Sequence, residues 1–139
     1  MIKSKIKFVY YDLKGELATE SLWADKYGNY YQVKNIPFFF PNIAYNDVIK
    51  VEEDSGELFF DELIIPSGNS TIQIVIYKIT HKKNILKELK QLGCGWEGLR
   101  DQPYYSINIP KEVNLDIVIS YLEEECKKNI LDYKVACIG

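Results

Sequence analysis

The stretch STIQIVIYKI, residues 70–79, opens the half of the chain that decides the fold, and LDYKVACIG, residues 131–139, closes it. Apolar alternation predicts strands, and apolar stripes at helical spacing predict helices. The predicted order is strand, helix, strand, strand, helix, strand, over residues 71–79, 82–92, 95–99, 104–109, 114–128 and 131–138. This is the order of a ferredoxin-like layer (a split βαβ unit), in which two helices cover one face of an antiparallel sheet.

The two faces of this predicted sheet differ in chemistry. Ile72, Ile74 and Ile76 share one face, which we expect the helices to cover. The opposite face mixes polar and tyrosine side chains: Gln73, Val75, Tyr77, Tyr104, Ser106, Asn108, Lys134 and Ala136. We expect this second face to meet solvent, the first half of the chain or a partner.

The first half of the chain contains strand patterns only. Short strands are predicted over 5–12, 20–25, 30–34, 47–53 and 57–65. Residues 35–45, NIPFFFPNIAY, hold two prolines and cannot form a central strand, so they predict an apolar connector against the core. The expected class is therefore α+β, with a small antiparallel roll or SH3-like barrel over 1–66 and the ferredoxin-like half over 67–139. We expect the two halves to fold as one cooperative unit.

Composition excludes several functions. The 139 residues hold 17 Lys and Arg against 20 Asp and Glu, a net charge of −3, which argues against a nucleic-acid backbone as partner. The strand 104–109 has tyrosines but no basic residue or glycine, which also disfavours RNA recognition. No apolar run is long enough for a membrane span or a signal peptide. Three cysteines, an odd number, suggest free thiols in a reducing cytoplasm.

The segment GCGWEG, residues 93–98, has the most unusual local composition and carries the only candidate reactive groups. Cys94 is a candidate nucleophile and Glu97 a candidate acid or base. The lone histidine, His81, stands at the opposite end of the predicted helix and is too far away to activate Cys94. The favoured alternative is a capped helix followed by a tight turn. One histidine and three scattered cysteines give no metal site, and no motif implies a cofactor.

Four segments together resemble the bacterial family known as domain of unknown function 4265. They are ESLWA at 20–24, NIPFF at 35–39, SGNST at 67–71 and LGCGWEG at 92–98. The resemblance implies a bacterial cytoplasmic protein and transfers no activity. The positions that it marks are Trp23, Pro37, Phe38, Gly95, Glu97 and Gly98.

Two functions remain open. The first is a non-catalytic protein-binding or regulatory module, for example an immunity protein that neutralises a toxin, or a chain that binds its own copy. The second is a small enzyme that uses Cys94 or Glu97. For the first function, surface aromatics near the junction of the halves are the expected anchors. The candidate binding residues are Tyr77, Tyr104, Ser106, Asn108, Phe38, Phe39 and Trp96.

Overall fold

The computed structural model describes residues 3–139, and it is an α+β chain with two mostly antiparallel sheets. The first sheet holds β1 (Lys3–Tyr11), β2 (Leu17–Tyr27), β3 (Tyr30–Val33), β4 (Val48–Asp54) and β5 (Glu57–Ile65). Each strand pairs antiparallel with the next. The last strand then returns to the first, because β5 and β1 pair in parallel at Ile6 with Leu58 and Lys7 with Phe59. The five strands thus close on themselves around a small core.

Alternation along β1 and β2 builds that core. Ile6 and Phe8 are fully buried from β1, and Leu22 and Ala24 point to the same interior from β2. The Phe8 ring stacks on Phe60 and meets Phe40 edge-on, each at a centroid distance of 5.1 Å. Gly28 occupies the left-handed region at φ 61° in the short turn between β2 and β3, where a glycine avoids the strain of a side chain.

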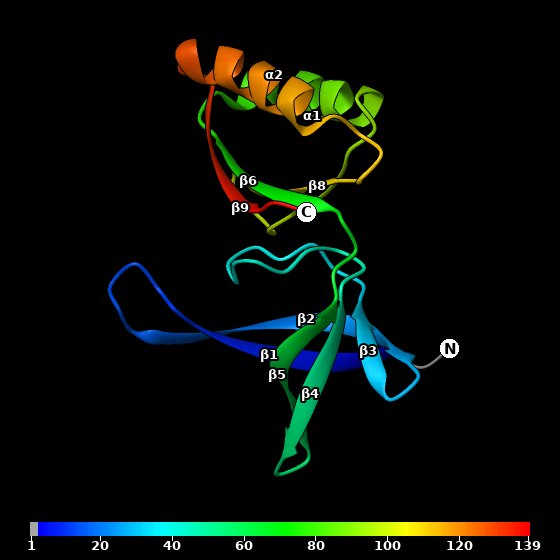
Figure 1. The fold of residues 1–139 in the computed structure, drawn as a ribbon. Coiled ribbons are helices and arrows are strands. Elements are labelled where there is room, and N and C mark those ends of the chain that lie inside the picture. Colours follow the sequence, from blue (N-terminus) through cyan, green and yellow to red (C-terminus); the bar gives the residue numbers. More distant parts are fainter. Residues whose placement is uncertain (1–2) are drawn as a thin grey trace.

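The second sheet has the strand order β7-β8-β6-β9. Its strands are β6 (Ser70–Ile76), β7 (Gly95–Gly98), β8 (Tyr104–Ile109) and β9 (Leu131–Cys137). Two helices, α1 (Lys82–Gln91) and α2 (Leu115–Lys127), lie side by side over one face of this sheet (Figure 1). A short 3₁₀ turn at Ile79–His81 leads into α1, so β6 ends at Ile76 and not at the predicted Ile79.

The face of the sheet that the helices cover is the isoleucine-rich one, as predicted. Ile72, Ile74 and Ile76 are at most 2% exposed and share one apolar cluster with Leu89 of α1 and Leu122 of α2. The helix ends follow local signals. Asn114 caps α2, because its Oδ1 accepts a hydrogen bond of 2.9 Å from the Asp116 N–H.

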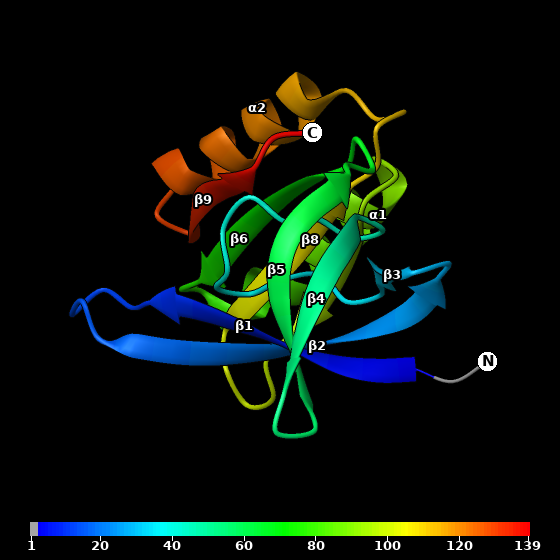
Figure 2. The ribbon, with the colours of Figure 1, turned by 60° about the horizontal axis from the view of Figure 1, so that its bottom comes forward.

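The connector, residues 35–45, forms a layer of its own. It runs between the open face of the second sheet and the first sheet, without regular structure (Figure 1). The β1–β2 hairpin projects beyond the body of the molecule in both views (Figures 1 and 2). Across residues 3–139, no helix has the length and apolar character that a membrane crossing requires.

Candidate functional site

Glu20 of β2 holds the connector against the first sheet. Its side chain is almost buried, at 8% exposure. Its carboxylate accepts three backbone hydrogen bonds, from the N–H groups of Phe38 at 2.7 Å, Phe39 at 3.1 Å and Phe40 at 3.0 Å. A segment that lies between two sheets without belonging to either must pair its buried N–H groups elsewhere, and a carboxylate does so strongly.

Glu97 of β7 binds the same connector from the other side. One of its oxygens accepts from the Ile36 N–H at 2.9 Å and the other from the Asn35 side-chain amide at 3.2 Å. The Asn35 oxygen in turn accepts from the Trp23 N–H at 2.7 Å, which continues the link to β2. Burial raises the pKa of Glu97, the bonds from Ile36 and Asn35 oppose that rise, and the charge of Glu20 adds to it. The two carboxylates therefore join the halves through the connector.

An aromatic cleft opens where this clamped connector meets the β1–β2 hairpin. Phe39 is 44% exposed, and its ring stacks on Tyr10 at 5.9 Å and lies 5.7 Å from the Tyr104 ring. The cavity beside these rings measures about 520 Å³, within the size range of ligand pockets. The hairpin forms one wall, and the polar face of the second sheet, through Gln73 and Lys134, forms the floor. We call this cavity the aromatic cleft.

The polar groups that line the aromatic cleft include hydrogen-bond donors as well as the carboxylates of Asp12 and Glu16. Gln73 is only 7% exposed, and its buried Nε2 has no hydrogen-bond partner among residues 3–139. The Tyr104 hydroxyl donates to the Phe38 carbonyl at 3.1 Å. Burial raises the pKa of both Tyr104 and Tyr10, and the nearby Glu20 charge adds to the effect. Both phenols are therefore protonated at neutral pH, but the single Tyr104 proton already goes to the Phe38 carbonyl, so only the Tyr10 hydroxyl of this pair is left to donate.

Comparison with known proteins places the chain in a family. A family model described as a domain of unknown function, DUF4265, matches residues 20–133. The chain belongs to this family. It is also similar to a crystal structure of a hypothetical protein from Neisseria gonorrhoeae, with a TM-score of 0.90 and 34% sequence identity over 100% of this chain and 97% of that one. No curated protein matches it.

The four segments that carry the resemblance to DUF4265 all lie at the junction of the halves. ESLWA supplies Glu20, NIPFF supplies the connector backbone, and LGCGWEG supplies Glu97. The fourth segment, SGNST, holds Asn69, whose side chain donates to the Tyr45 carbonyl at 3.0 Å and accepts from the Lys111 N–H at 3.1 Å. In this DUF4265 chain, these segments therefore have a structural role that accounts for their composition.

The predicted binding residues are dispersed. Phe39 and Tyr104 line the aromatic cleft, and half-buried Phe38 lies behind them with its ring 6.1 Å from Tyr104. Ser106 is fully buried and donates to the Ile36 carbonyl at 3.2 Å. The others lie elsewhere: Asn108 is 8% exposed beside a separate polar cavity, Tyr77 is 62% exposed beyond the end of β6, and Trp96 is 43% exposed on the helix side of the sheet.

The environments of Cys94 and Glu97 do not suit reactive groups. Cys94 is 6% exposed, and burial raises the pKa of its thiol to about 11, so the nucleophilic thiolate is scarce at neutral pH. His81 and Cys94 flank the two ends of α1, a helix about 15 Å long. Both oxygens of Glu97 already accept hydrogen bonds from the connector. No cluster of metal-ligating side chains occurs in the described part of the chain.

Most residues that line the aromatic cleft, Tyr10 and Gln73 among them, are not among the predicted binding residues. Tyr10 lies within the strand predicted over 5–12, and Gln73 lies on the predicted polar face. Nothing local indicates that the β1–β2 hairpin passes the second sheet, because that contact joins residues more than 60 positions apart. The one available signal was Gln73 itself, a glutamine within a run of isoleucine and valine.

Proposed function

We propose that this DUF4265 chain is a non-catalytic protein-binding module, and that the aromatic cleft receives an apolar or aromatic side chain of its partner. The observation that carries this proposal is the exposed apolar surface of the β1–β2 hairpin, of which Tyr11 and Leu13 also line the cleft. Along the hairpin, Val9, Tyr11 and Leu17 are 45%, 72% and 67% exposed, and Leu13 at the tip is fully exposed. An exposed apolar surface of this kind is characteristic of protein interaction sites.

The shape of the molecule supports the same proposal. The hairpin extends from the body as an arm (Figures 1 and 2), which leaves it accessible to a partner. Phe39, Tyr10 and Tyr104 give rigid aromatic walls, which cost little side-chain entropy on binding.

The enzyme alternative has less support. A reactive Cys94 would need a lower thiol pKa and a neighbouring base, and a reactive Glu97 would have to release the connector. Each of these changes would cost stability before any chemistry began. The contacts of both residues are those of a packed junction.

The test uses a photoreactive amino acid in place of Leu13 in the full chain. Cross-linking in cells that express the protein at its natural level, followed by mass spectrometry, should identify one recurrent protein. That protein, purified, should bind the unmodified chain in calorimetry. Leu13→Glu and Phe39→Ala should each weaken this binding at least tenfold. If the neighbouring gene encodes a toxin, its product is the first purified partner to test.

The matched control is Ile117→Glu, which makes the same chemical change at a 55% exposed residue on the far side of α2. It should leave the affinity within twofold of wild type. Equal losses from Leu13→Glu and Ile117→Glu, or none from either, would overturn the proposal. Sedimentation of the chain alone tests self-association, and a dimer lost on Leu13→Glu would identify the partner as a second copy.

The finer fold names and the origin of the chain are proposals as well. The order β7-β8-β6-β9 with both helices on one face supports a ferredoxin-like assignment for the second half. The closed pairing of five short strands supports an SH3-like assignment for the first half. Similarity to a Neisseria protein supports a bacterial origin, and a cytoplasmic location remains a prediction.

A further inference from the structure

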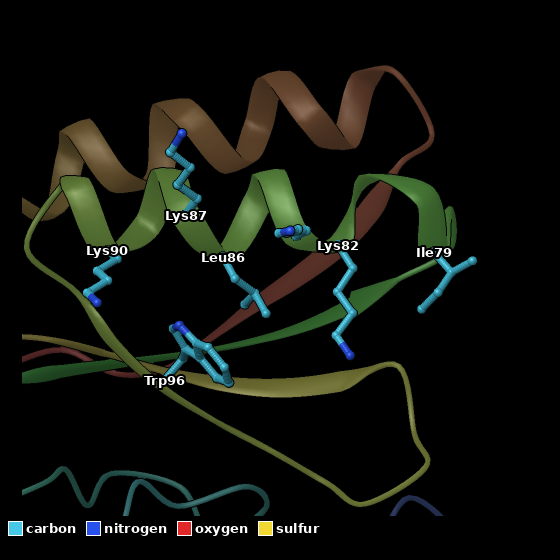
Figure 3. Close-up of a pocket in the computed structure, with 7 residues that line it drawn as sticks. Ile79, Lys82, Leu86, Lys87, Lys90 and Trp96 are labelled. Carbon is cyan, nitrogen blue, oxygen red and sulfur yellow. The ribbon is translucent and has the colours of Figure 1, made fainter.

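A separate groove lies on the helix side of the second sheet, away from the aromatic cleft. This groove, of about 570 Å³, runs between α1 and the edge strand β7. Its floor is apolar: the Leu86 side chain points from α1 toward Trp96 of β7, and Ile79 stands at one end (Figure 3). Trp96 is 43% exposed, although its ring also packs edge-on against Tyr105 at 5.9 Å. We call this feature the lysine groove.

Four lysines surround this apolar floor. Lys82 and Lys90 extend toward β7 on either side of Trp96, whereas Lys87 points away from the strand (Figure 3). Lys83 completes the set. None of the four forms a salt bridge within residues 3–139, and the one close partner of the Lys82 ammonium is the Tyr105 ring, 5.5 Å away. A protein with a net charge of −3 thus concentrates unneutralised positive charge in one groove.

The backbone beside the groove has free hydrogen-bonding groups. β7 pairs with β8 alone and forms one edge of the sheet. The Leu99 N–H donates to the Tyr104 carbonyl, so in this antiparallel register the alternate residues Trp96 and Gly98 direct their backbone N–H and C=O groups outward. Gly95 and Gly98 carry no side chains that would obstruct an approaching backbone. An extended segment could therefore add to this edge as a further strand.

We propose that the lysine groove binds an acidic, extended segment of a partner protein by strand addition at β7. The distance between the lysines that flank the groove sets the spacing of acidic residues in the segment. Lys82 and Lys90 are eight residues apart on α1, about 12 Å along the axis. Side chains four residues apart on one face of a strand are separated by about 13 Å. The segment has the pattern acidic-x-apolar-x-acidic, with its central side chain on Leu86 and Trp96 and its carboxylates at Lys82 and Lys90.

This inference is independent of the proposed function. The lysine groove and the aromatic cleft lie on opposite faces of the second sheet, and no residue lines both. Attraction between unlike charges supplies the steering toward the groove, the apolar contact at Trp96 supplies affinity, and the strand pairing fixes the direction of the segment.

The experiment uses the full chain and a fluorescein-labelled peptide, TETFTET, whose glutamates flank the phenylalanine at the required spacing. Fluorescence anisotropy should show saturable binding that weakens with added salt, and Trp96 emission should shift on binding. The charge-inverted peptide TKTFTKT should not bind. N-methylation at the peptide positions that face β7 should abolish binding, and N-methylation at the outward positions should not.

Charge reversal on the protein provides the matched test. Lys82→Glu combined with Lys90→Glu should weaken binding of TETFTET at least tenfold. The control is Lys127→Glu on α2, which should change the affinity less than twofold. Circular dichroism should give the same spectrum for both variants as for wild type, since these side chains are at the surface.

Three results would overturn the inference. The first is no saturable binding of TETFTET at millimolar concentration. The second is equal binding by wild type and the double variant, or by the peptide with N-methylation on either side. The third is a single-stranded oligonucleotide that binds more tightly than the peptide, since that would assign the positive charge to a nucleic-acid partner.

Discussion

At the scale of single residues, the carboxylates of Glu20 and Glu97 bind the connector from the two halves. The two carboxylate oxygens of Glu20 accept hydrogen bonds from the backbone N–H groups of Phe38, Phe39 and Phe40. We predict that Glu20→Gln lowers the free energy of unfolding by about 2–3 kcal/mol, because the charge is lost and an amide N–H₂ faces backbone donors. Urea unfolding followed by circular dichroism measures the change.

The control for this prediction is Glu16→Gln, at an exposed position in the β1–β2 hairpin. It should change stability by less than about 0.5 kcal/mol. A Glu20→Gln variant as stable as the Glu16→Gln variant would show that the connector does not depend on the Glu20 charge.

At the scale of elements, the two glycines of β7 differ in the space around them. A methyl group on Gly98 would lie 2.6 Å from Cε2 of the Tyr105 ring, whereas one on Gly95 would meet no atom within 4 Å. We predict that Gly98→Ala destabilises the protein by about 1–3 kcal/mol, since a buried ring has no room to retreat. Gly95→Ala, the matched control on the same strand, should be neutral. Thermal melting of the two variants compares them directly, and equal melting temperatures would contradict the prediction.

β7 contributes side chains to both the lysine groove and the junction of the halves. The Trp96 side chain and the Glu97 side chain point to opposite faces of β7, as strand geometry requires. Trp96 faces the lysine groove, and Glu97 holds the connector beneath the aromatic cleft. A four-residue strand thereby contributes to a surface feature on one side and to the junction on the other.

At the scale of the whole molecule, the connector links two apolar clusters, one in each half. We predict that they unfold together, since the hydrogen bonds of Glu20, Glu97, Ser106 and Tyr104 to the connector are lost if either half opens. The two tryptophans report on different halves, Trp23 on β2 and Trp96 on β7. The experiment unfolds Trp23→Phe and Trp96→Phe in urea and follows the fluorescence of the one tryptophan that each variant retains. For each variant, the fluorescence midpoint should match the midpoint from circular dichroism. The two fluorescence transitions should also have equal widths. Fluorescence and circular dichroism midpoints that separate would indicate two independent domains.

Local patterns determined much of this protein. The strands at Glu57–Ile65 and Tyr104–Ile109 have the predicted bounds, the isoleucine face lies under the helices, and Gly93 ends α1 at φ 97° as its position predicts. These features depend on side-chain alternation, helical spacing and backbone freedom, which act over a few residues and are therefore readable from the sequence.

Only the tertiary structure decided what the polar and aromatic residues do. Glu97 and Ile36 are 61 positions apart, and Glu20 and Phe38 are 18 apart, so no local pattern reveals that these carboxylates bind the connector. The aromatic cleft likewise requires a hairpin, a connector and a sheet from three parts of the chain, and the lysine groove requires a helix beside an edge strand. Such sites depend on which surfaces meet, and that is settled by packing of the whole chain, because the free energy of burying one face depends on the face that covers it.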